Sequence, residues 1–297
     1  MERKELGRLL FPHVLNEIQG DIDNTVFSFI PNTAEVAFYG FVDAIHEYLN
    51  KQKAEKITTA QGSLSKAEIE KILSQSARVE KLAIKDEKLR TFIADDSSRG
   101  EMISHVYDVT YGVVRNNIDT IVVLDDSIVR GATLRDSILE ILSRLRPKKI
   151  IVISSAPQIR YPDCYGIDMS KMGEFAAFQA LISLIKEHGY EDKLTEVYRR
   201  AKELEKDGDL VKQNMVKELY SLFTYEQISD RIGMILTPHG MECEVKIIFQ
   251  TIDDLKKACP NNSGDWYFSG DYPTPGGNRV VNRSFINFVE NRNERAY

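Results

Sequence analysis

The stretch that most constrains the fold is residues 121–133, Ile-Val-Val-Leu-Asp-Asp-Ser-Ile-Val-Arg-Gly-Ala-Thr. Its first four residues are apolar and mostly β-branched, which predicts a strand buried on both faces, as in a parallel sheet. Two carboxylates and a short turn follow, and apolar residues then recur at helical spacing through residue 145. We expect Thr133, with Asp136 three residues later, to cap this helix. In an open α/β sheet, such a strand-to-helix junction is where ligands bind.

The turn suits a phosphate group, because the first backbone N–H groups of a helix are unpaired and the helix dipole is positive there. The hydroxyls of Ser127 and Thr133 can donate to the same phosphate oxygens. Gly131 permits the positive φ and the close backbone approach that such a turn needs. Asp125 and Asp126 can accept hydrogen bonds from sugar hydroxyls or hold a hydrated Mg²⁺.

These groups together fit a ligand with a phosphate at one end, vicinal hydroxyls beside it and a metal-bridged anion beyond. A ribose 5-phosphate with a pyrophosphate on C1 has all three. The turn contains neither the P-loop pattern nor the Gly-rich dinucleotide fingerprint. The alternative is a solvated acidic pair at a strand end, in which Asp126 or Ser127 only caps a turn. The Gly-x-Thr spacing and the apolar helical stripe favour the ligand site.

Composition sets the outer limits of the function. The chain has 297 residues, 42% of them apolar and 28% charged, which is typical of a globular protein with one large domain or two modest ones. A formal charge of −6 argues against nucleic acid and anionic membranes as partners. No apolar run approaches the ~18 residues of a membrane span. The cysteines are odd in number and widely spaced: Cys164, Cys243 and Cys259. This pattern predicts a cytoplasmic location and no disulfide framework.

Residues 121–133 resemble the phosphoribosyl-pyrophosphate (PRPP) binding motif of type I phosphoribosyltransferases. Two further blocks, 23–33 (Asp-Asn-Thr-Val-Phe-Ser-Phe-Ile-Pro-Asn-Thr) and 154–169 (Ser-Ser-Ala-Pro-Gln-Ile-Arg-Tyr-Pro-Asp-Cys-Tyr-Gly-Ile-Asp-Met), narrow the resemblance to the amidophosphoribosyltransferase family. The resemblance implies the type I phosphoribosyltransferase fold, an α/β fold with a mostly parallel twisted sheet flanked by helices. A small hood and a C-terminal helical and irregular extension complete it.

The resemblance also implies a reaction. The 5-phosphoribosyl group of PRPP passes to ammonia, which full-length members take from glutamine, and the products are 5-phosphoribosylamine and pyrophosphate, in the first step of purine synthesis. It assigns PRPP binding to Asp125, Asp126, Ser127, Ile128, Val129, Arg130, Gly131, Ala132, Thr133, Pro31, Asn32 and Thr33. It assigns Mg²⁺ to Thr33, Asp125 and Asp126. It assigns catalysis to Asp125, Asp126, Arg90 and Lys85. By itself, Thr33 reads more simply as a helix cap.

Residues 85–93 match a family loop that closes over the substrate, with a Lys-Asn-Arg-Tyr signature followed by Arg-Thr-Phe-Ile. The second part is present from Arg90 onward, but Asp86 and Glu87 stand where asparagine and arginine are expected. Which cation meets the leaving pyrophosphate therefore stays open among Lys85, Lys88 and Arg90. This departure supports one alternative function, a non-catalytic sensor of PRPP or nucleotides. A second alternative is a salvage transferase that uses a nucleobase.

Other expectations concern cofactors and partners. Full-length family members carry an N-terminal glutaminase domain, and the chain begins inside the transferase part, so we expect a truncated or separately encoded half with ammonia-dependent activity only. Some members bind an iron–sulfur cluster, but no four-thiolate set occurs in this sequence, and we expect no cluster. The family is usually oligomeric, so we expect a homo-oligomer. Purine nucleotides as inhibitors are left open.

The pattern along the chain predicts a phosphoribosyltransferase core over 1–189 with an insertion at 51–78. A helical extension over 190–260, with a late strand that completes the site, and an irregular tail over 261–297 are expected to follow. Aromatic residues of the tail are expected to pack it down. The polar run 51–64 is expected to form a surface loop. The expected strands cover 24–30, 79–84, 121–124, 150–154 and 245–250, and the expected helices cover 2–19, 34–50, 65–77, 101–114 and 171–188.

Overall fold

The structure is a computed structural model that describes residues 1–85, 107–163, 169–262 and 264–296. The chain forms two compact units. The sheet unit contains residues 1–126, 133–155 and 238–250, and the helical unit contains residues 127–132, 156–237 and 251–297. These units do not follow the boundaries predicted after residues 189 and 260.

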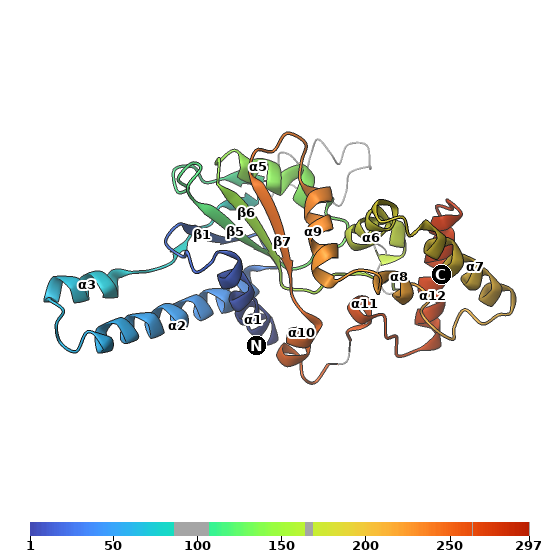
Figure 1. The fold of residues 1–297 in the computed structure, drawn as a ribbon, viewed down its shortest axis with the longest axis horizontal. Coiled ribbons are helices and arrows are strands. Elements are labelled where there is room, and N and C mark those ends of the chain that lie inside the picture. Colours follow the sequence, from blue (N-terminus) through green and yellow to red (C-terminus); the bar gives the residue numbers. More distant parts are fainter. Residues whose placement is uncertain (86–106, 164–168, 263, 297) are drawn as a thin grey trace. The chain divides into compact units, whose positions relative to one another are not determined.

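The sheet unit is built on a five-stranded sheet in the order β2-β1-β5-β6-β7, and every neighbouring pair is parallel (Figure 1). The predicted parallel α/β fold is therefore confirmed. The strand from the PRPP-like motif lies in the centre of the sheet, and its apolar residues are fully buried, as expected. The strands are β1 (Thr25–Phe29), β2 (Arg78–Val79), β5 (Thr120–Asp125), β6 (Lys149–Ser154) and β7 (Glu244–Phe249).

A small antiparallel pair, β3 (Ala83–Lys85) and β4 (Tyr107–Val109), stands beside this sheet. The single strand predicted over 79–84 is thus divided between two sheets. The helix predicted over 101–114 is wrong at residues 107–114, because residues 107–109 form β4 and residues 110–114 form no helix; residues 101–106 lie outside the described part. Local spacing could not reveal this pairing, because β4 is defined by a partner more than twenty residues earlier in the chain.

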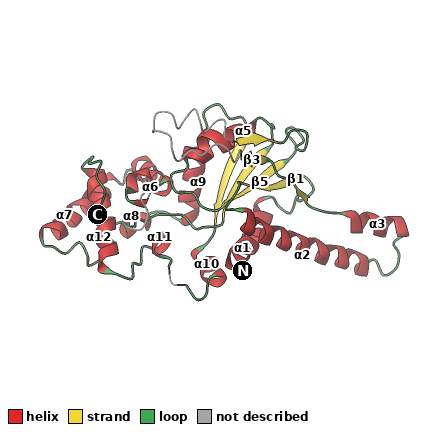
Figure 2. Ribbon diagram, turned by 180° about the vertical axis from the view of Figure 1, so that it is seen from behind, coloured by secondary structure: helices red, strands yellow, loops and turns green. Residues whose placement is uncertain are grey.

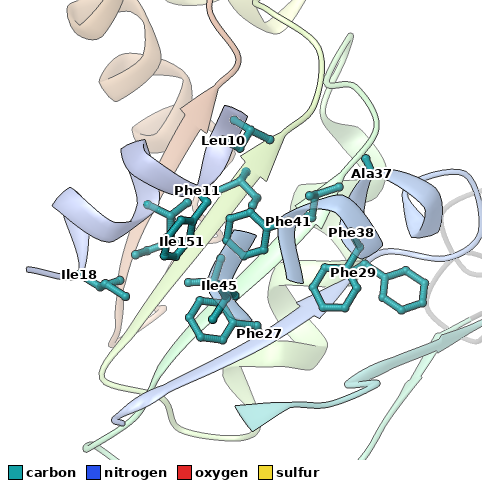
Figure 3. Close-up of a cluster of buried hydrophobic side chains, with 14 of the residues drawn as sticks. Leu10, Phe11, Ile18, Phe27, Phe29, Ala37, Phe38, Phe41, Ile45 and Ile151 are labelled. Carbon is teal, nitrogen blue, oxygen red and sulfur yellow. The ribbon is translucent and has the colours of Figure 1, made fainter. Parts of the chain in front are cut away.

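Helices α1 (Glu2–Glu17) and α2 (Glu35–Thr59) cover one face of the sheet. Figure 3 shows the aromatic side chains that fill this layer, with the ring of Phe41 5.9 Å from that of Phe11 and 5.8 Å from that of Phe27. The two helices cross in backbone contact, because a Cβ atom on Gly40 would lie 1.8 Å from the carbonyl oxygen of Lys4. This crossing anchors α2, and with it the turn that precedes α2.

Helix α2 continues well beyond its predicted end, so the loop predicted over 51–64 is wrong as far as Thr59. The run from Lys51 is polar but rich in Lys, Glu, Gln and Ala, which prolong a helix that tertiary packing has already started. Both views show α2 extending past the sheet with α3 (Lys66–Ser74) at its far end (Figures 1 and 2). The capping box predicted at Ser65 and Glu68 is confirmed.

The helical unit contains the rest of the fold. Its tail was predicted to be irregular, and this is wrong over α12. This helix has a buried face that includes Val281, Phe285 and Ile286. Glycine and asparagine in its first turns concealed that apolar spacing. The elements are η4 (Met172–Glu174), α6 (Ala176–Glu187), α7 (Glu191–Lys206), α8 (Lys217–Tyr220), α9 (Tyr225–Leu236), α10 (Ile252–Ala258), α11 (Trp266–Ser269) and α12 (Pro275–Val289).

The aromatic residues of the tail hold it down, as predicted. The indole N–H of Trp266 donates to the Asp163 carboxylate, and the backbone carbonyl of Tyr267 accepts hydrogen bonds from the N–H groups of Arg160 and Tyr161. In the part of the chain that the structure describes, no helix combines the length and the hydropathy needed to cross a membrane.

Candidate functional site

The candidate site lies at the carboxyl edge of the sheet. The register pairs Phe29 with Leu124, and the N–H of Ile30 donates to the Leu124 carbonyl at 2.8 Å. Because β1 and β5 are parallel and adjacent, the turn 31–33 and the acidic pair 125–126 leave the sheet at the same edge. Two segments almost a hundred residues apart therefore leave the sheet at the same edge, which is where open α/β sheets bind ligands.

The acidic pair is held by hydrogen bonds at this edge. The N–H of Asp126 donates to Oδ1 of Asp125 at 2.9 Å. Ser155, which follows β6, donates its N–H to the Asp125 carbonyl at 2.9 Å and its hydroxyl to the Asp126 carbonyl at 3.1 Å. Burial and the neighbouring charge of Asp126 raise the pKa of Asp125 to about 8. A cation at this position would favour the ionised form.

This electrostatic situation fits Mg²⁺. Among the described residues, no group of three or more His, Cys, Asp or Glu side chains is placed to hold a metal ion. Mg²⁺ does not require one, because it is commonly held by one or two carboxylates together with substrate phosphates. Asp125 and Asp126 supply two adjacent carboxylates whose mutual repulsion a divalent cation would relieve, and Thr33 supplies a hydroxyl at the same edge.

The turn after β1 leaves its polar side chains exposed. Pro31 is buried, whereas Asn32 and Thr33 are exposed, and the peptide bond between Pro31 and Asn32 is cis. Thr33 does not cap the following helix, because Ala34 occupies the N-cap position of α2 and no side chain accepts a hydrogen bond there. The simple capping role considered for Thr33 is therefore absent, and no hydrogen bond joins its hydroxyl to another described residue.

The turn predicted to bind phosphate covers residues 127–133, and its residues 127–132 belong to the helical unit. Val129 accepts a hydrogen bond at 2.8 Å from the N–H of Ala176, and Nη2 of Arg130 lies 2.6 Å from a carboxylate oxygen of Glu174. Gly131 has a φ of +75°, and a Cβ atom there would lie 2.6 Å from both terminal carbons of Leu236. The predicted need for glycine at this position is confirmed.

Thr133 differs from its prediction. Its backbone is already helical, with φ −59° and ψ −39°, and its side chain makes no capping hydrogen bond. An N-cap residue needs an extended backbone, so the predicted capping pair with Asp136 is wrong. The helix that follows starts as a π-helix, η2 (Leu134–Leu139), and continues as α5 (Glu140–Ser143). Its predicted apolar stripe is buried throughout, at Leu134, Ile138, Ile141, Leu142 and Leu145.

The structure describes little of the residues predicted to be the catalytic cations. Lys85 ends β3, and the structure does not describe its side chain. Arg90 lies outside the described residues, as do Asp86, Glu87 and Lys88. Their roles remain predictions.

One cluster near the quoted block 154–169 was not predicted. The guanidinium of Arg160 lies 4.7 Å from the ring centre of Tyr220 and 5.0 Å from that of Tyr225. Its Nε and Nη2 donate to the side-chain oxygen of Gln158 at 2.9 and 2.8 Å. Gln158 in turn donates to the Ser229 hydroxyl at 2.7 Å. The tyrosines lie in the charged segment 190–230, where sequence alone gave no sign of their target.

Parts of this chain are similar to known proteins. No family model matches the chain. It is 35% identical over 137 residues to the amidophosphoribosyltransferase of Haemophilus influenzae, a match that covers 46% of this chain and 25% of that protein. It is 47% identical over 58 residues to the Pasteurella multocida enzyme of the same name, covering 20% of this chain and 11% of that protein. The chain therefore spans about a quarter or less of the curated relatives it matches.

Two solved structures also match. The glutamine PRPP amidotransferase from B. subtilis, complexed with ADP and GMP, has a TM-score of 0.48 at 20% identity over 92% of this chain and 42% of that one. An allosteric regulatory enzyme of purine biosynthesis has a TM-score of 0.49 at 20% identity over 92% of this chain and 41% of that one.

Proposed function

We propose that this chain, whose curated relatives are amidophosphoribosyltransferases, is a phosphoribosyltransferase that moves the 5-phosphoribosyl group of PRPP to ammonia. The observation that carries the proposal is the meeting of the turn 31–33 with Asp125 and Asp126 at one edge of a parallel sheet. Similarity to amidophosphoribosyltransferases supports the choice of ammonia as the acceptor.

Each segment has a role that its chemistry allows. Asp125 and Asp126 accept hydrogen bonds from the ribose hydroxyls, and their negative charge stabilises positive charge that develops on the sugar ring. Backbone N–H groups of residues 127–133 hold the 5-phosphate, which is remote from the reacting carbon, so its binding energy serves orientation. The turn 31–33 faces the pyrophosphate.

The reaction breaks the bond between C1 and the pyrophosphate oxygen, whose electron pair leaves with pyrophosphate. The nitrogen of ammonia donates its lone pair to C1, and the resulting ammonium group loses one proton to solvent. Mg²⁺, held by Asp125, Asp126 and Thr33, would supply positive charge for the leaving pyrophosphate. Lys85 and Arg90 are proposed to supply further positive charge.

Several proposals concern the whole protein. We propose that a glutaminase domain, in the same chain or in a second one, supplies ammonia from glutamine. A cytoplasmic homo-oligomer without an iron–sulfur cluster is the form we expect.

Pyrophosphate release tests the activity. The purified chain with PRPP, Mg²⁺ and a high ammonium concentration should release pyrophosphate, and Asp125→Asn should reduce the rate by about 100-fold or more, since charge stabilisation at the transition state is lost. Asp207→Asn, a substitution of the same kind at an exposed residue, should leave the rate unchanged. Equal rates for wild type and Asp125→Asn would contradict the proposal.

One alternative has a specific observation in its favour. Asp86 and Glu87 stand where the resembled loop has asparagine and arginine, which suits a sensor that binds PRPP without turning it over. PRPP binding in the absence of pyrophosphate release would identify the sensor. Faster release with a purine or pyrimidine base than with ammonium would identify a salvage enzyme.

A further inference from the structure

A polar pocket of about 660 Å³ lies at the opposite edge of the sheet from Asp125. It is lined by residues that immediately precede β5, β6 and β7, among them Asn117, Lys148 and Cys243. In a parallel sheet the amino ends of the strands share one edge. All residues that line this pocket belong to the sheet unit. Its volume falls within the range of about 300–1,000 Å³ that is usual for small-molecule sites.

The pocket is rich in cations. Arg144, Arg146 and Lys148 line it, and Glu242 is the acidic residue among its described lining. Arg144 is paired with Glu140 at 3.2 Å, but neither Arg146 nor Lys148 makes an ion pair with any described residue. Lys149, the next residue, is by contrast paired. Its Nζ lies 2.5 Å from a carboxylate oxygen of Glu17 and 2.9 Å from one of Glu244.

The backbone that carries these cations is held by a hydrogen bond to a second segment. Arg146 and Asn117 both have positive φ values, +48° and +57°, and the N–H of Asn117 donates to the Arg146 carbonyl at 2.7 Å. Pro147, between Arg146 and Lys148, is buried. Non-glycine residues rarely hold a positive φ, and the hydrogen bond between them stabilises both. The exposed side chains of Arg146 and Lys148 therefore leave a short segment whose backbone is tied to Asn117.

Attraction to the carboxyl end of α5 does not account for the whole set. A cation near the last helical turn is stabilised by the helix dipole, and Arg144 fits that description. Lys148 follows the buried Pro147, and the N–H of Lys148 already donates to the Asp119 carbonyl at 2.9 Å on the β5 side. In a protein with 45 acidic and 39 basic residues, two cations beside this pocket thus have no acidic partner among the described residues.

We propose that this pocket binds a small molecule that carries two or more linked phosphate groups, separately from the site at the carboxyl edge. Guanidinium and ammonium groups are the usual partners of phosphate oxygens, and Ser143 and Asn117 supply further polar groups. No aromatic ring lines the described pocket, so the phosphates rather than a stacked base provide the recognition.

Cys243 gives a local test of this proposal, because its half-buried thiol lines the same pocket. The probe is inorganic tripolyphosphate, added to the full chain at constant ionic strength without Mg²⁺. We measure the rate of alkylation at Cys243 by peptide mass spectrometry, with Cys259 as the internal reference. Tripolyphosphate should slow alkylation of Cys243, and half-protection should occur at a defined concentration.

Arg146→Gln combined with Lys148→Gln should raise that concentration by about tenfold or more, since two charge-assisted contacts are lost. Lys148→Gln alone, at an exposed side chain, should raise it by a smaller factor and so keeps the test valid if the double variant folds poorly. The matched control, Arg279→Gln combined with Lys206→Gln, removes the same charge from exposed positions and should leave protection intact. Asp125→Asn should also retain it, which separates this pocket from the proposed function.

Three results would overturn the proposal. One is an unchanged alkylation rate at Cys243 with tripolyphosphate. Another is equal loss of protection in the control pair, which would show general charge screening. The third is stronger protection by a single-stranded oligonucleotide at equal phosphate concentration, which would assign the surface to a polymer instead.

Discussion

At the scale of single residues, the site depends on carboxylates in two different electrostatic environments. Asp125 has a half-buried side chain beside another carboxylate, and burial together with the charge of Asp126 raises its pKa to about 8. Asp119, six residues earlier, is fully buried. Burial raises its pKa, but hydrogen bonds from Arg115 and Arg78 outweigh that effect and hold the pKa below its usual value. Asp119 therefore has two cationic partners, whereas a bound cation would be needed to favour the ionised form of Asp125.

Asp125 should make the stability of the metal-free chain depend on pH. Its pKa is about 8 when folded and near 3.9 when unfolded, so the folded chain loses stability as pH rises between these values. Asp125→Asn lacks this loss, and from pH 5 to 8 wild type should fall relative to the variant by at most about 1.4 kcal/mol per pH unit. Denaturant unfolding in EDTA measures the difference, and Asp207→Asn should follow wild type. A pH-independent difference between wild type and Asp125→Asn would show that Asp125 is ionised throughout.

Asp119→Asn should destabilise the sheet unit by about 2–4 kcal/mol, because it leaves the guanidinium groups of Arg78 and Arg115 without their buried partner. The exposed pair Arg199–Glu203 provides the control. Glu203→Gln should change the free energy of unfolding by less than about 0.5 kcal/mol. Similar effects for the two substitutions, measured by urea unfolding, would mean that the Asp119 cluster contributes no more than a surface ion pair.

At the scale of elements, the crossing of α1 and α2 positions the turn 31–33. Gly7 and Gly40 let the two backbones touch, since a Cβ atom on Gly7 would lie 1.8 Å from the Ala37 carbonyl oxygen. These helices were predicted, whereas the glycine contact between them was not. Glycines inside helices usually read as weak points, and only the partner helix reveals why they are needed.

Gly40→Ala should destabilise the sheet unit by about 2 kcal/mol or more, because the added methyl group meets backbone rather than a movable side chain. Gly276→Ala in α12 is the matched control. Its Cβ atom would have only a contact of 3.9 Å with Thr274, so we expect a neutral or slightly stabilising effect. Thermal unfolding of both variants measures the difference. An unchanged stability of Gly40→Ala would show that the two helices can move apart without cost.

At the scale of the whole molecule, the sequence predicted what depends on local pattern. The four apolar residues before Asp125 predicted a buried central strand, and Gly131 predicted a positive φ; the structure confirms both. The errors arose where distant segments decide the outcome. Pairing with β3 made residues 107–109 a strand, and packing in the helical unit turned part of the tail into α12. The sequence block 154–169 contains Arg160, but the two tyrosines that contact its guanidinium group lie about sixty residues later in the chain.

A crystal structure of the chain with PRPP and Mg²⁺ tests most directly whether the carboxyl edge of the sheet binds PRPP. We expect the ribose hydroxyls at Asp125 and Asp126, the 5-phosphate on the backbone N–H groups of residues 127–133, and the pyrophosphate at Asn32 and Thr33. A sugar phosphate bound elsewhere, for example only in the pocket beside Lys148, would contradict the claim.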